Sequence, residues 1–401
     1  MKRTRWSGLV VATGLVLGTA ACGGGGSDGD GGGETITIGY LASLTGPAAN
    51  DAARDVAGAE VAVDELNEAG GIDGHQVELV VRDDKSDPTV GTREARDLVL
   101  TEEVNVLAGG NISSVAAGIQ QVAGQTKTPY IISTAGAASL IEETGNPYTF
   151  RSWTNTASLP GPMAEWAAEQ DFERIAIIYA NNANGIERAT SFKSIVAEND
   201  PEAEIVGEVA IEPTDTDFSS TINRVNAMDA DAVLMAGVFG STLQGLIKQA
   251  LPLGLYDDAI AMAFISNTDL AALADVGLPP GKQVAYNNFF PTIDDPFVTE
   301  FDEKIQEATD QQADGSDFVG YTTIQWVAAA VEAAGSIERQ EIADALPGLT
   351  LDTFVGEVTM REDGQATGQS WFGRVEDDRQ GGLTIVDAQT APSDDFLTPL
   401  G

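Results

Sequence analysis

Residues 109–114 of the sequence, Gly-Gly-Asn-Ile-Ser-Ser, place a glycine pair, an amide and two hydroxyls directly after an apolar run. Ser113 and Ser114 open a helical pattern, where unpaired backbone N–H groups and the positive end of the helix dipole favour an anion. Ligands of open α/β sheets bind at the carboxyl ends of strands, and this loop is such an end. A ligand carboxylate therefore suits Asn111, Ser113 and Ser114. An alternative interpretation is that Ser113 only caps its helix, as serines often do.

Other chemistries lack the side chains that they need. The chain has one histidine, His75, and one cysteine, Cys22, which rules out a His-rich metal site and an intrachain disulfide. The sequence carries no G-x-S-x-G elbow, H-E-x-x-H motif or EF-hand spacing, and its aspartate pairs, such as Asp83 and Asp84, are scattered. We therefore expect no catalytic residues, no metal and no cofactor, and an exported enzyme is the least favoured class.

The charge of the chain excludes one class of partner. Its 401 residues include 62 acidic and 21 basic side chains, for a formal net charge of -41, yet 43% of the residues are hydrophobic. Binding to a nucleic-acid backbone needs clustered Lys and Arg, so we expect no nucleic-acid partner. The hydrophobic fraction allows one large or two medium-sized cores and argues against disorder. An acid-rich surface resembles those of proteins that work in high salt, which we hold as a hypothesis.

The first 34 residues carry an export pattern. Residues 1–21 begin with three basic side chains, continue with an apolar run at residues 9–17 and end on small residues before Cys22. The run is too short to span a bilayer, so a signal peptide is expected. The small residues resemble a bacterial lipobox, which makes Cys22 the lipidation site and residues 22–34 a Gly-rich tether. The protein would then be exported to the cell surface or periplasm and touch the membrane only through its lipid anchor. The alternative is an ordinary signal peptide followed by a free thiol.

From residue 35 onward, apolar strand-like runs alternate with amphipathic helical patterns, which predicts parallel sheets built from strand-helix-strand units. We expect strands at residues 35–40, 77–82, 104–109, 129–133, 174–179, 204–210, 232–236, 259–264 and 283–286. Helices are expected at residues 51–67, 88–101, 113–125, 159–170, 185–197, 218–227, 240–251, 297–308 and 318–334. The end of the chain predicts hairpin strands with a turn at Asp363-Gly364. This number of strands exceeds one typical core, so we expect two sheets and a crossing near residues 151–158.

Several segments, taken in their order and spacing, carry a family resemblance. They are residues 39–47 (GYLASLTGP), 67–74 (NEAGGIDG), 82–88 (RDDKSDP), 109–114 and 356–360 (GEVTM). Together they resemble the substrate-binding proteins of ABC importers, in the leucine/isoleucine/valine-binding branch with the periplasmic binding protein type I fold. The resemblance implies an α/β protein of two doubly wound parallel-sheet lobes, joined by a three-crossing hinge that closes on a ligand. By position, the N-terminal lobe would be residues 35–151 plus 288–372, and the C-terminal lobe residues 152–287 plus 373–401.

The resemblance also assigns site residues in the first lobe. It implies that Ser113 hydrogen-bonds a ligand carboxylate. It further implies that the loop after the strand at residues 129–133 holds the ligand through the backbone of Ala135 and Ala137, because the family's hydroxyl residue is replaced by Ala137. Asp51 stands where the family has an aromatic residue.

The other lobe departs further from the family. Asn184 and Phe239 occupy positions of family aromatics, and residues 264–266 lack the expected acidic partner for a ligand ammonium. Asp51 or Asp269 would have to replace that partner.

The resemblance implies a function in uptake. We expect a monomeric solute-binding lipoprotein that captures a small carboxylate-bearing molecule and delivers it to an ABC permease and ATPase complex. Branched-chain or other amino acids, amides and aromatic acids all stay open as ligands, because an acid or amide needs no ammonium partner. The alternative is a ligand-sensing regulator that uses the same fold without transport.

Overall fold

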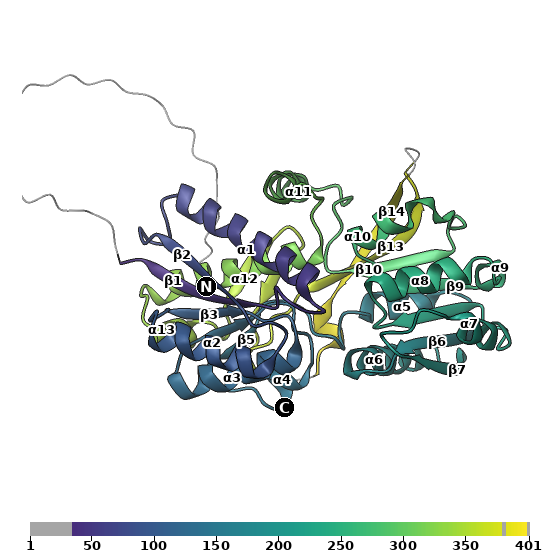
Figure 1. The fold of residues 1–401 in the computed structure, drawn as a ribbon, viewed down its shortest axis with the longest axis horizontal. Helices are drawn as coiled ribbons and strands as arrows, with labels where there is room; N and C mark the ends of the chain where they lie inside the picture. Colours follow the sequence, from purple (N-terminus) through teal and green to yellow (C-terminus); the bar gives the residue numbers. More distant parts are fainter. Residues whose placement is uncertain (1–33, 379–381, 399–401) are drawn as a thin grey trace, which may run out of the picture. The chain divides into compact units, whose positions relative to one another are not determined.

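The computed structural model describes residues 34–378 and 382–398. The predicted signal peptide, Cys22 and all of the predicted tether except Glu34 lie outside the described residues. Two separate, largely parallel sheets dominate the described part, each with helices on both faces (Figure 1). The α/β class and the two doubly wound sheets that the sequence predicts are therefore confirmed.

The first sheet has five parallel strands in the order β2-β1-β3-β4-β5. They are β1 (Ile36–Ala42), β2 (Val77–Asp83), β3 (Val106–Gly109), β4 (Tyr130–Ile132) and β5 (Thr149–Arg151). Its helices are α1 (Ala49–Glu68), α2 (Pro88–Leu100), α3 (Ser113–Thr126), α4 (Ser139–Glu142), α11 (Pro296–Thr309), α12 (Gly315–Ala334) and α13 (Arg339–Ala345). Alternate strand residues bury opposite faces: Ile38 packs toward α1 and α12, and Leu107 packs toward α2 and α3. A small hairpin, β11 (Thr350–Thr353) and β12 (Gly356–Thr359), packs against α12.

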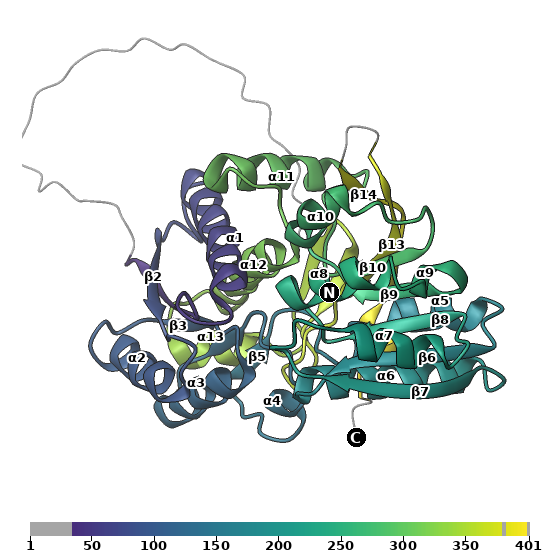
Figure 2. The same ribbon diagram turned by 45° about the vertical axis from the view of Figure 1, so that its right-hand side comes forward.

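The second sheet has seven strands in the order β14-β13-β10-β9-β8-β6-β7 (Figure 2). They are β6 (Arg174–Ala180), β7 (Glu204–Ile211), β8 (Ala232–Ala236), β9 (Ile260–Phe264), β10 (Gln283–Asn287), β13 (Gln369–Asp377) and β14 (Leu383–Pro392). Strand β13 pairs antiparallel with both β10 and β14. Its helices are α5 (Gly161–Glu169), α6 (Ala183–Asn199), α7 (Ser219–Asn226), α8 (Gly240–Ala250), α9 (Leu255–Asp258) and α10 (Asn267–Leu273), with the short 3-10 turns η1 (Ala274–Val276) and η2 (Ser393–Phe396). Ile177 packs toward α5 and α6, whereas Met235 packs toward α7 and α8.

The predicted strands and helices are all present, with ends that differ by a few residues. Strands β5 and β11 were not predicted. The turn at Asp363-Gly364 is present, because Gly364 has a φ of +87° and donates its N–H to Arg361 O at 2.9 Å. The predicted hairpin of the two flanking strands is wrong, because β12 pairs with β11 and β13 pairs with β10 and β14, and the turn itself is spanned by an isolated antiparallel bridge. The chain passes between the sheets three times, after β5, after β10 and before β13. The predicted lobe ranges stay a prediction, and β13 already pairs with β10 from Trp371 on.

Candidate functional site

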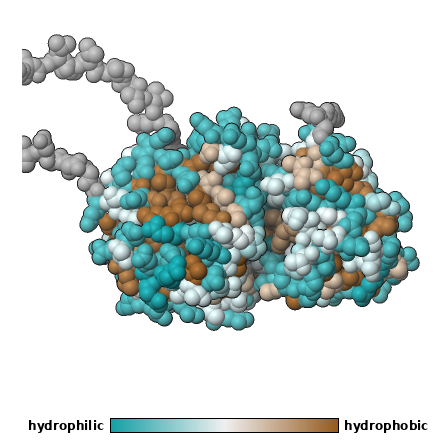
Figure 3. Space-filling model, viewed as in Figure 1, coloured by the Kyte–Doolittle hydropathy of each residue, from teal (hydrophilic) through white to brown (hydrophobic). Residues whose placement is uncertain are grey.

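A cavity of about 210 Å³ lies where the carboxyl ends of strands from both sheets meet. Residues that follow β3, β4, β5, β6, β8, β9 and β10 line it, together with the first turns of α1 and α12. This is the place where open α/β sheets bind ligands. The face of the molecule in Figure 3 is hydrophilic over much of its area and hollowed between the two halves. The lining residues are Ala48, Asn50, Asp51, Arg54, Asn111, Ser133, Thr134, Gly136, Trp153, Thr154, Asn155, Thr156, Leu159, Asn184, Arg188, Phe239, Phe264, Ser266, Asn288, Asp314, Gly315, Ser316 and Val319.

The structure separates the predicted site residues into two groups. Asp51, Asn111, Asn184 and Phe239 line the cavity. The other four, Ser113, Ser114, Ala135 and Ala137, are not among its lining residues. A role for these four in ligand binding stays a prediction.

The four residues outside the lining belong to two adjoining loops of the first sheet. The Ser113 hydroxyl accepts a hydrogen bond from Ala137 N at 3.2 Å, so the hydroxyl and the amide bond each other. Ala135 is buried and donates its N–H to Gly110 O at 2.9 Å. Ser114 is exposed in the first turn of α3. In this arrangement the polar groups of the two loops hold the loops together.

Asn111 lies at the centre of a hydrogen-bond network on the first-sheet side. Its amide nitrogen donates to Asp55 Oδ2 and to Thr134 Oγ1, both at 2.9 Å, and its amide oxygen accepts from Ser43 N at 3.0 Å. The Ser133 hydroxyl donates to the same Asp55 oxygen at 2.7 Å. Every polar atom of the Asn111 side chain is thus used inside the protein. Its amide holds the β1, β3 and β4 loops and α1 in one arrangement.

Asp55 is the buried acid on which this network rests. It is fully buried in α1, and burial raises the pKa of Asp55 to about 7 although hydrogen bonds from Ser133 and Asn111 favour the charged form. One of its oxygens, Oδ1, has no hydrogen-bond partner among the described residues. No local pattern predicts this role, since Asp55 is one of 62 acidic residues in the chain.

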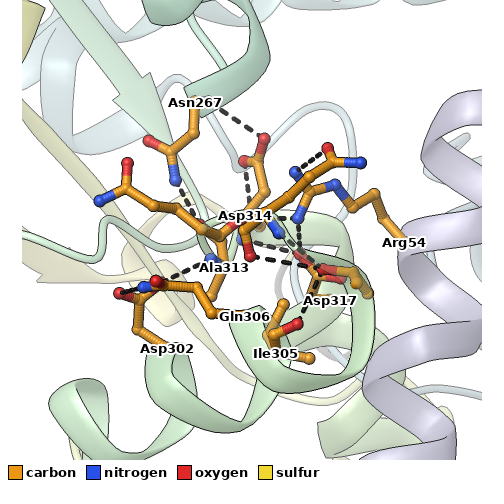
Figure 4. Close-up of polar contacts among 12 residues, drawn as sticks. Arg54, Asn267, Asp302, Ile305, Gln306, Ala313, Asp314 and Asp317 are labelled. Carbon is orange, nitrogen blue, oxygen red and sulfur yellow. Dashed lines mark hydrogen bonds and ion pairs between the residues drawn. The ribbon is translucent and has the colours of Figure 1, made fainter.

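Arg54 and Asp317 form a second buried group beside the cavity (Figure 4). Arg54 donates to Asp317 Oδ2 at 2.8 Å and to Gln312 O at 2.6 Å. Asp317 also closes a capping box with Asp314 at the start of α12. Burial is the main cause that raises the pKa of both aspartates, and Arg54 opposes it. The positive charge of Arg54 is therefore compensated within the protein.

Arg188 is the second cation at the cavity, and its surroundings differ. It lies on α6, is 5% exposed, and donates from Nε to Asn184 Oδ1 at 2.9 Å and from Nη1 to Tyr286 Oη at 3.2 Å. Its guanidinium carbon is 5.3 Å from the ring centres of both Phe239 and Phe264 and 5.7 Å from that of Tyr286. Among the described residues, no carboxylate forms an ion pair with Arg188.

Asp51 is the acid that faces the cavity without a partner. Its carboxylate has no hydrogen bond or ion pair with any described residue, and the side chain is exposed. Partial shielding from water and, secondly, the charge of Asp269 raise the pKa of Asp51. Asp269 itself is buried, accepts from Ser266 Oγ at 2.7 Å and from Gln244 at 2.9 Å, and does not line the cavity.

Direct hydrogen bonds join the two sides of the cavity at its rims. Asn267, at the start of α10, donates its backbone N–H to Asp314 Oδ2 at 3.0 Å and its side-chain amide to Ala313 O (Figure 4). On the other side, Ala138 N donates to Glu187 Oε1 at 3.1 Å. These bonds can form only while the two sides are close together.

Two further properties bear on function. Within residues 34–378 and 382–398, no group of three or more His, Cys, Asp or Glu side chains is arranged to hold a metal ion. In the same part of the chain, no helix has the length and hydrophobicity to cross a membrane.

Comparisons with known proteins agree with this architecture. A family model described as periplasmic binding protein matches residues 35–381. The Leu/Ile/Val-binding protein BraC3 of Rhizobium johnstonii is 30% identical over 350 residues, which cover 84% of this chain and 90% of the relative. An ABC transporter substrate-binding protein from Sphaerobacter thermophilus has a TM-score of 0.82 at 25% identity, over 91% of this chain and 100% of that chain. An ABC transporter solute-binding protein from Rhodopseudomonas palustris, in complex with 3,4-dihydroxybenzoic acid, has a TM-score of 0.79 at 20% identity, over 90% and 98% of the two chains.

The chain belongs to the periplasmic binding protein family, in its Leu/Ile/Val-binding branch. The resemblance expected from residues 39–47, 67–74 and 82–88 is confirmed, as is the periplasmic binding protein type I fold. The protein is thus of the solute-binding kind that serves ABC transporters, and its relatives are transport proteins and not enzymes.

Proposed function

We propose that this protein captures a small carboxylate-bearing molecule between its two lobes and delivers it to an ABC permease and ATPase complex. The observation that carries the proposal is the cavity itself, because both sheets contribute their strand ends to it and it holds a cation, Arg188, without an acidic partner. The names of the relatives support a carboxylate: leucine, isoleucine, valine and 3,4-dihydroxybenzoic acid all carry one. The amino-acid and aromatic-acid classes are both part of this proposal.

Lobe closure is the proposed mode of capture. The lobes would be residues 35–151 plus 288–372 and 152–287 plus 373–401, hinged at the three passes of the chain. A ligand that contacts both walls favours the closed arrangement by its differential affinity, and the Asn267–Asp314 and Ala138–Glu187 bonds add to it. We expect the closed protein, acting as a monomer, to be the form that the permease recognises.

The test of ligand capture is a thermal-shift screen with confirmation by calorimetry. Purified residues 34–401 are mixed with aliphatic and aromatic amino acids, their amides and aromatic acids. A ligand that binds only the folded form raises the melting temperature. At a ligand concentration one hundred times its Kd, the free energy of unfolding increases by about 2.7 kcal/mol. A carboxylate that shifts the melting temperature, while its amide does not, supports the proposal. If no carboxylate binds, the proposal fails.

A transport assay with the partner complex distinguishes the two proposed roles, transport and sensing. Vesicles that carry the ABC permease and ATPase complex proposed as the partner should take up the bound ligand only when the protein is present. Uptake that does not depend on the protein would favour the ligand-sensing regulator.

Anchoring by a lipid on Cys22 is a further part of the proposal. Metabolic labelling with a fatty acid should mark the full chain, and Cys22→Ala should abolish the label and release the protein from the membrane fraction. Label on the Cys22→Ala variant, or its continued sedimentation with membranes, would contradict anchoring at this residue.

A further inference from the structure

The wall of the cavity formed by the second sheet carries a positive charge where the family resemblance leads one to expect a negative one. Residues 264–266 are Phe-Ile-Ser, and Asp269 turns back to Ser266 and Gln244. Arg188 occupies this wall, on the second turn of α6. The charge on the second wall is therefore reversed.

The cage around Arg188 explains how this charge is kept in place. Phe239 and Phe264 meet edge to face at 5.6 Å, and Phe264 and Tyr286 do so at 5.7 Å, so three rings surround the guanidinium. The guanidinium carbon lies within 5.7 Å of all three ring centres, and its Nε and Nη1 donate to Asn184 and Tyr286. Its Nη2 has no acceptor among the described residues, and Arg188 lines the cavity. A buried cation without an anion is costly, and a bound carboxylate would remove that cost.

The other charges at the cavity narrow the choice of ligand. Four lining side chains are titratable: Asp51, Arg54, Arg188 and Asp314. Arg54 is paired with Asp317, and Asp314 accepts from Asn267, Asn287 and Gly315. Asp51 and Arg188, one on each wall, form no ion pair with any described residue, and the charges of Arg54 and Glu187 act on them only at longer range. An acid and a base that line the same cavity and form no ion pair within the described protein suit a zwitterion.

We infer that the ligand is an amino acid that lies across the cleft with its carboxylate on Arg188 of the second wall and its ammonium at Asp51 of the first. This inference rests on the proposed function and specifies the substrate class and orientation. The orientation is opposite to the one that the family resemblance implies, in which Ser113 holds the carboxylate. The reversed orientation agrees with the hydrogen bond that the Ser113 hydroxyl already accepts from Ala137 N. The exposed ring of Phe239 offers an apolar contact for the side chain of the ligand.

The test compares Arg188→Met with Arg188→Lys and with Arg224→Met, an exposed arginine on α7 of the same lobe. Calorimetry uses L-leucine and L-phenylalanine, their deaminated acids 4-methylpentanoate and 3-phenylpropanoate, and the corresponding amines. Arg188→Met should weaken the binding of the amino acid that wild type prefers by about tenfold or more, because a charge-assisted hydrogen bond is lost. Arg188→Lys should keep part of the affinity, and Arg224→Met should keep all of it.

Two further readouts separate ligand binding from a structural role. The melting temperature of ligand-free Arg188→Met should stay close to that of wild type, whereas a purely structural role would lower it. The hydrogen bonds and ring contacts that are lost are offset by removal of a buried charge that forms no ion pair with a described residue. Asp51→Asn should weaken binding of the amino acid but leave the affinity for its deaminated acid unchanged. The inference is overturned if Arg188→Met binds with wild-type affinity, or if the deaminated acid binds wild type more tightly than the amino acid. In either case the proposed capture of a carboxylate still stands. If wild type binds none of the carboxylates, both the inference and the proposed function fail.

Discussion

The two walls of the cavity treat their polar groups in different ways. On the first wall, Asn111 and Ser133 both donate to Asp55, and Arg54 is paired with Asp317, so these buried groups are held within the protein, whereas the exposed Asp51 forms no hydrogen bond or ion pair with any described residue. On the second wall, Arg188 is held by aromatic rings and neutral groups and has no acidic partner. The difference teaches that the first wall gives the cleft a fixed shape, whereas the second wall retains a charge that a ligand can satisfy.

This contrast makes the two buried arginines unequal in stability. Arg54→Ala leaves Asp317 buried without its cation, which typically costs about 3 to 5 kcal/mol of the free energy of unfolding. Arg188→Ala removes a cation that forms no ion pair with any described acid, so it should cost clearly less. Arg224→Ala is the control, and as an exposed change it should stay within about 0.5 kcal/mol of wild type.

The measurement is urea unfolding at pH 8. At this pH the Arg54→Ala variant must keep the Asp317 carboxylate charged and buried without Arg54, which lowers its free energy of unfolding. The cost of Arg54→Ala should shrink at pH 5, because burial raises the pKa of Asp317 and protonation then relieves the unpaired charge. Equal losses for Arg54→Ala and Arg188→Ala at pH 8 would remove the contrast between the walls.

The first wall is also defined by the close approach of α1 and α12. A Cβ atom added to Gly58 would lie 1.7 Å from Asp317 O, and one added to Gly320 would lie 1.9 Å from Asp55 O. Gly58→Ala therefore forces the helices apart and should cost about 3 kcal/mol. The matched control on the second lobe is Gly245→Ala in α8, whose Cβ would meet only Phe218 Cε2 at 3.2 Å. Thermal unfolding should place Gly245→Ala near wild type, because alanine favours helix; a similar loss in both variants would contradict the close packing at Gly58.

The fold was largely predictable from the sequence, because it rests on local patterns. The alternation of apolar residues in runs such as 174–179 predicts both the strand and its two buried faces, and Pro88 and Gly364 mark a helix start and a turn. Strand β5 was missed because its three residues, Thr-Phe-Arg, include only one apolar side chain, whereas the equally short β4, Tyr-Ile-Ile, is part of an apolar run. Phe239 and Asn184 were assigned as site residues by the family resemblance, as positions of family aromatics, and both line the cavity.

The chemistry of the cavity was less predictable. Arg188 lies one turn beyond Asn184, and nothing in the local sequence distinguishes it from an arginine on a solvated helix face. Its role depends on Phe239, Phe264 and Tyr286, which come from three other strands or loops and meet only in the folded protein. Asp55 and Arg54 are likewise defined by distant partners, such as Ser133 and Asp317. Long-range contacts of this kind have no signature in a single sequence.

The buried acid of the first wall should make stability depend on pH. Burial raises the pKa of Asp55 to about 7, so the folded protein keeps this proton at pH values where the unfolded chain, with an ordinary pKa near 4, has lost it. The contribution of Asp55 to stability is thus fully present below about pH 4, falls as the pH rises to about 7 and is constant above that. The groups that face this carboxyl are Tyr40, Asp51, Asn111 and Ser133.

Asp55→Asn removes this titration and is the variant that tests it. Relative to wild type, the free energy of unfolding of Asp55→Asn should rise by roughly 2 kcal/mol between pH 4 and pH 7.5, about half of the full linkage value, because relaxation and water entry reduce such shifts. Urea unfolding across this range measures the difference. Glu357→Gln, on the exposed β12 edge, is the control and should show no such slope. A flat difference between Asp55→Asn and wild type would mean that Asp55 is ionised throughout.

The smallest expected effect concerns the hydrogen bonds that join the walls. Asn267→Ala removes the side-chain bond to Ala313 O but keeps the backbone bond to Asp314, so the closed arrangement should lose about 1 kcal/mol. Asn226→Ala removes a comparable bond, to Leu253 O at 2.7 Å, that lies wholly within the second lobe. Small-angle scattering of the ligand-free protein should therefore detect a larger radius of gyration for Asn267→Ala only, and ligand should restore it. If Asn226→Ala expands as much, the expansion does not come from loss of a bond between the walls, and the Asn267 side chain does not hold the ligand-free protein closed.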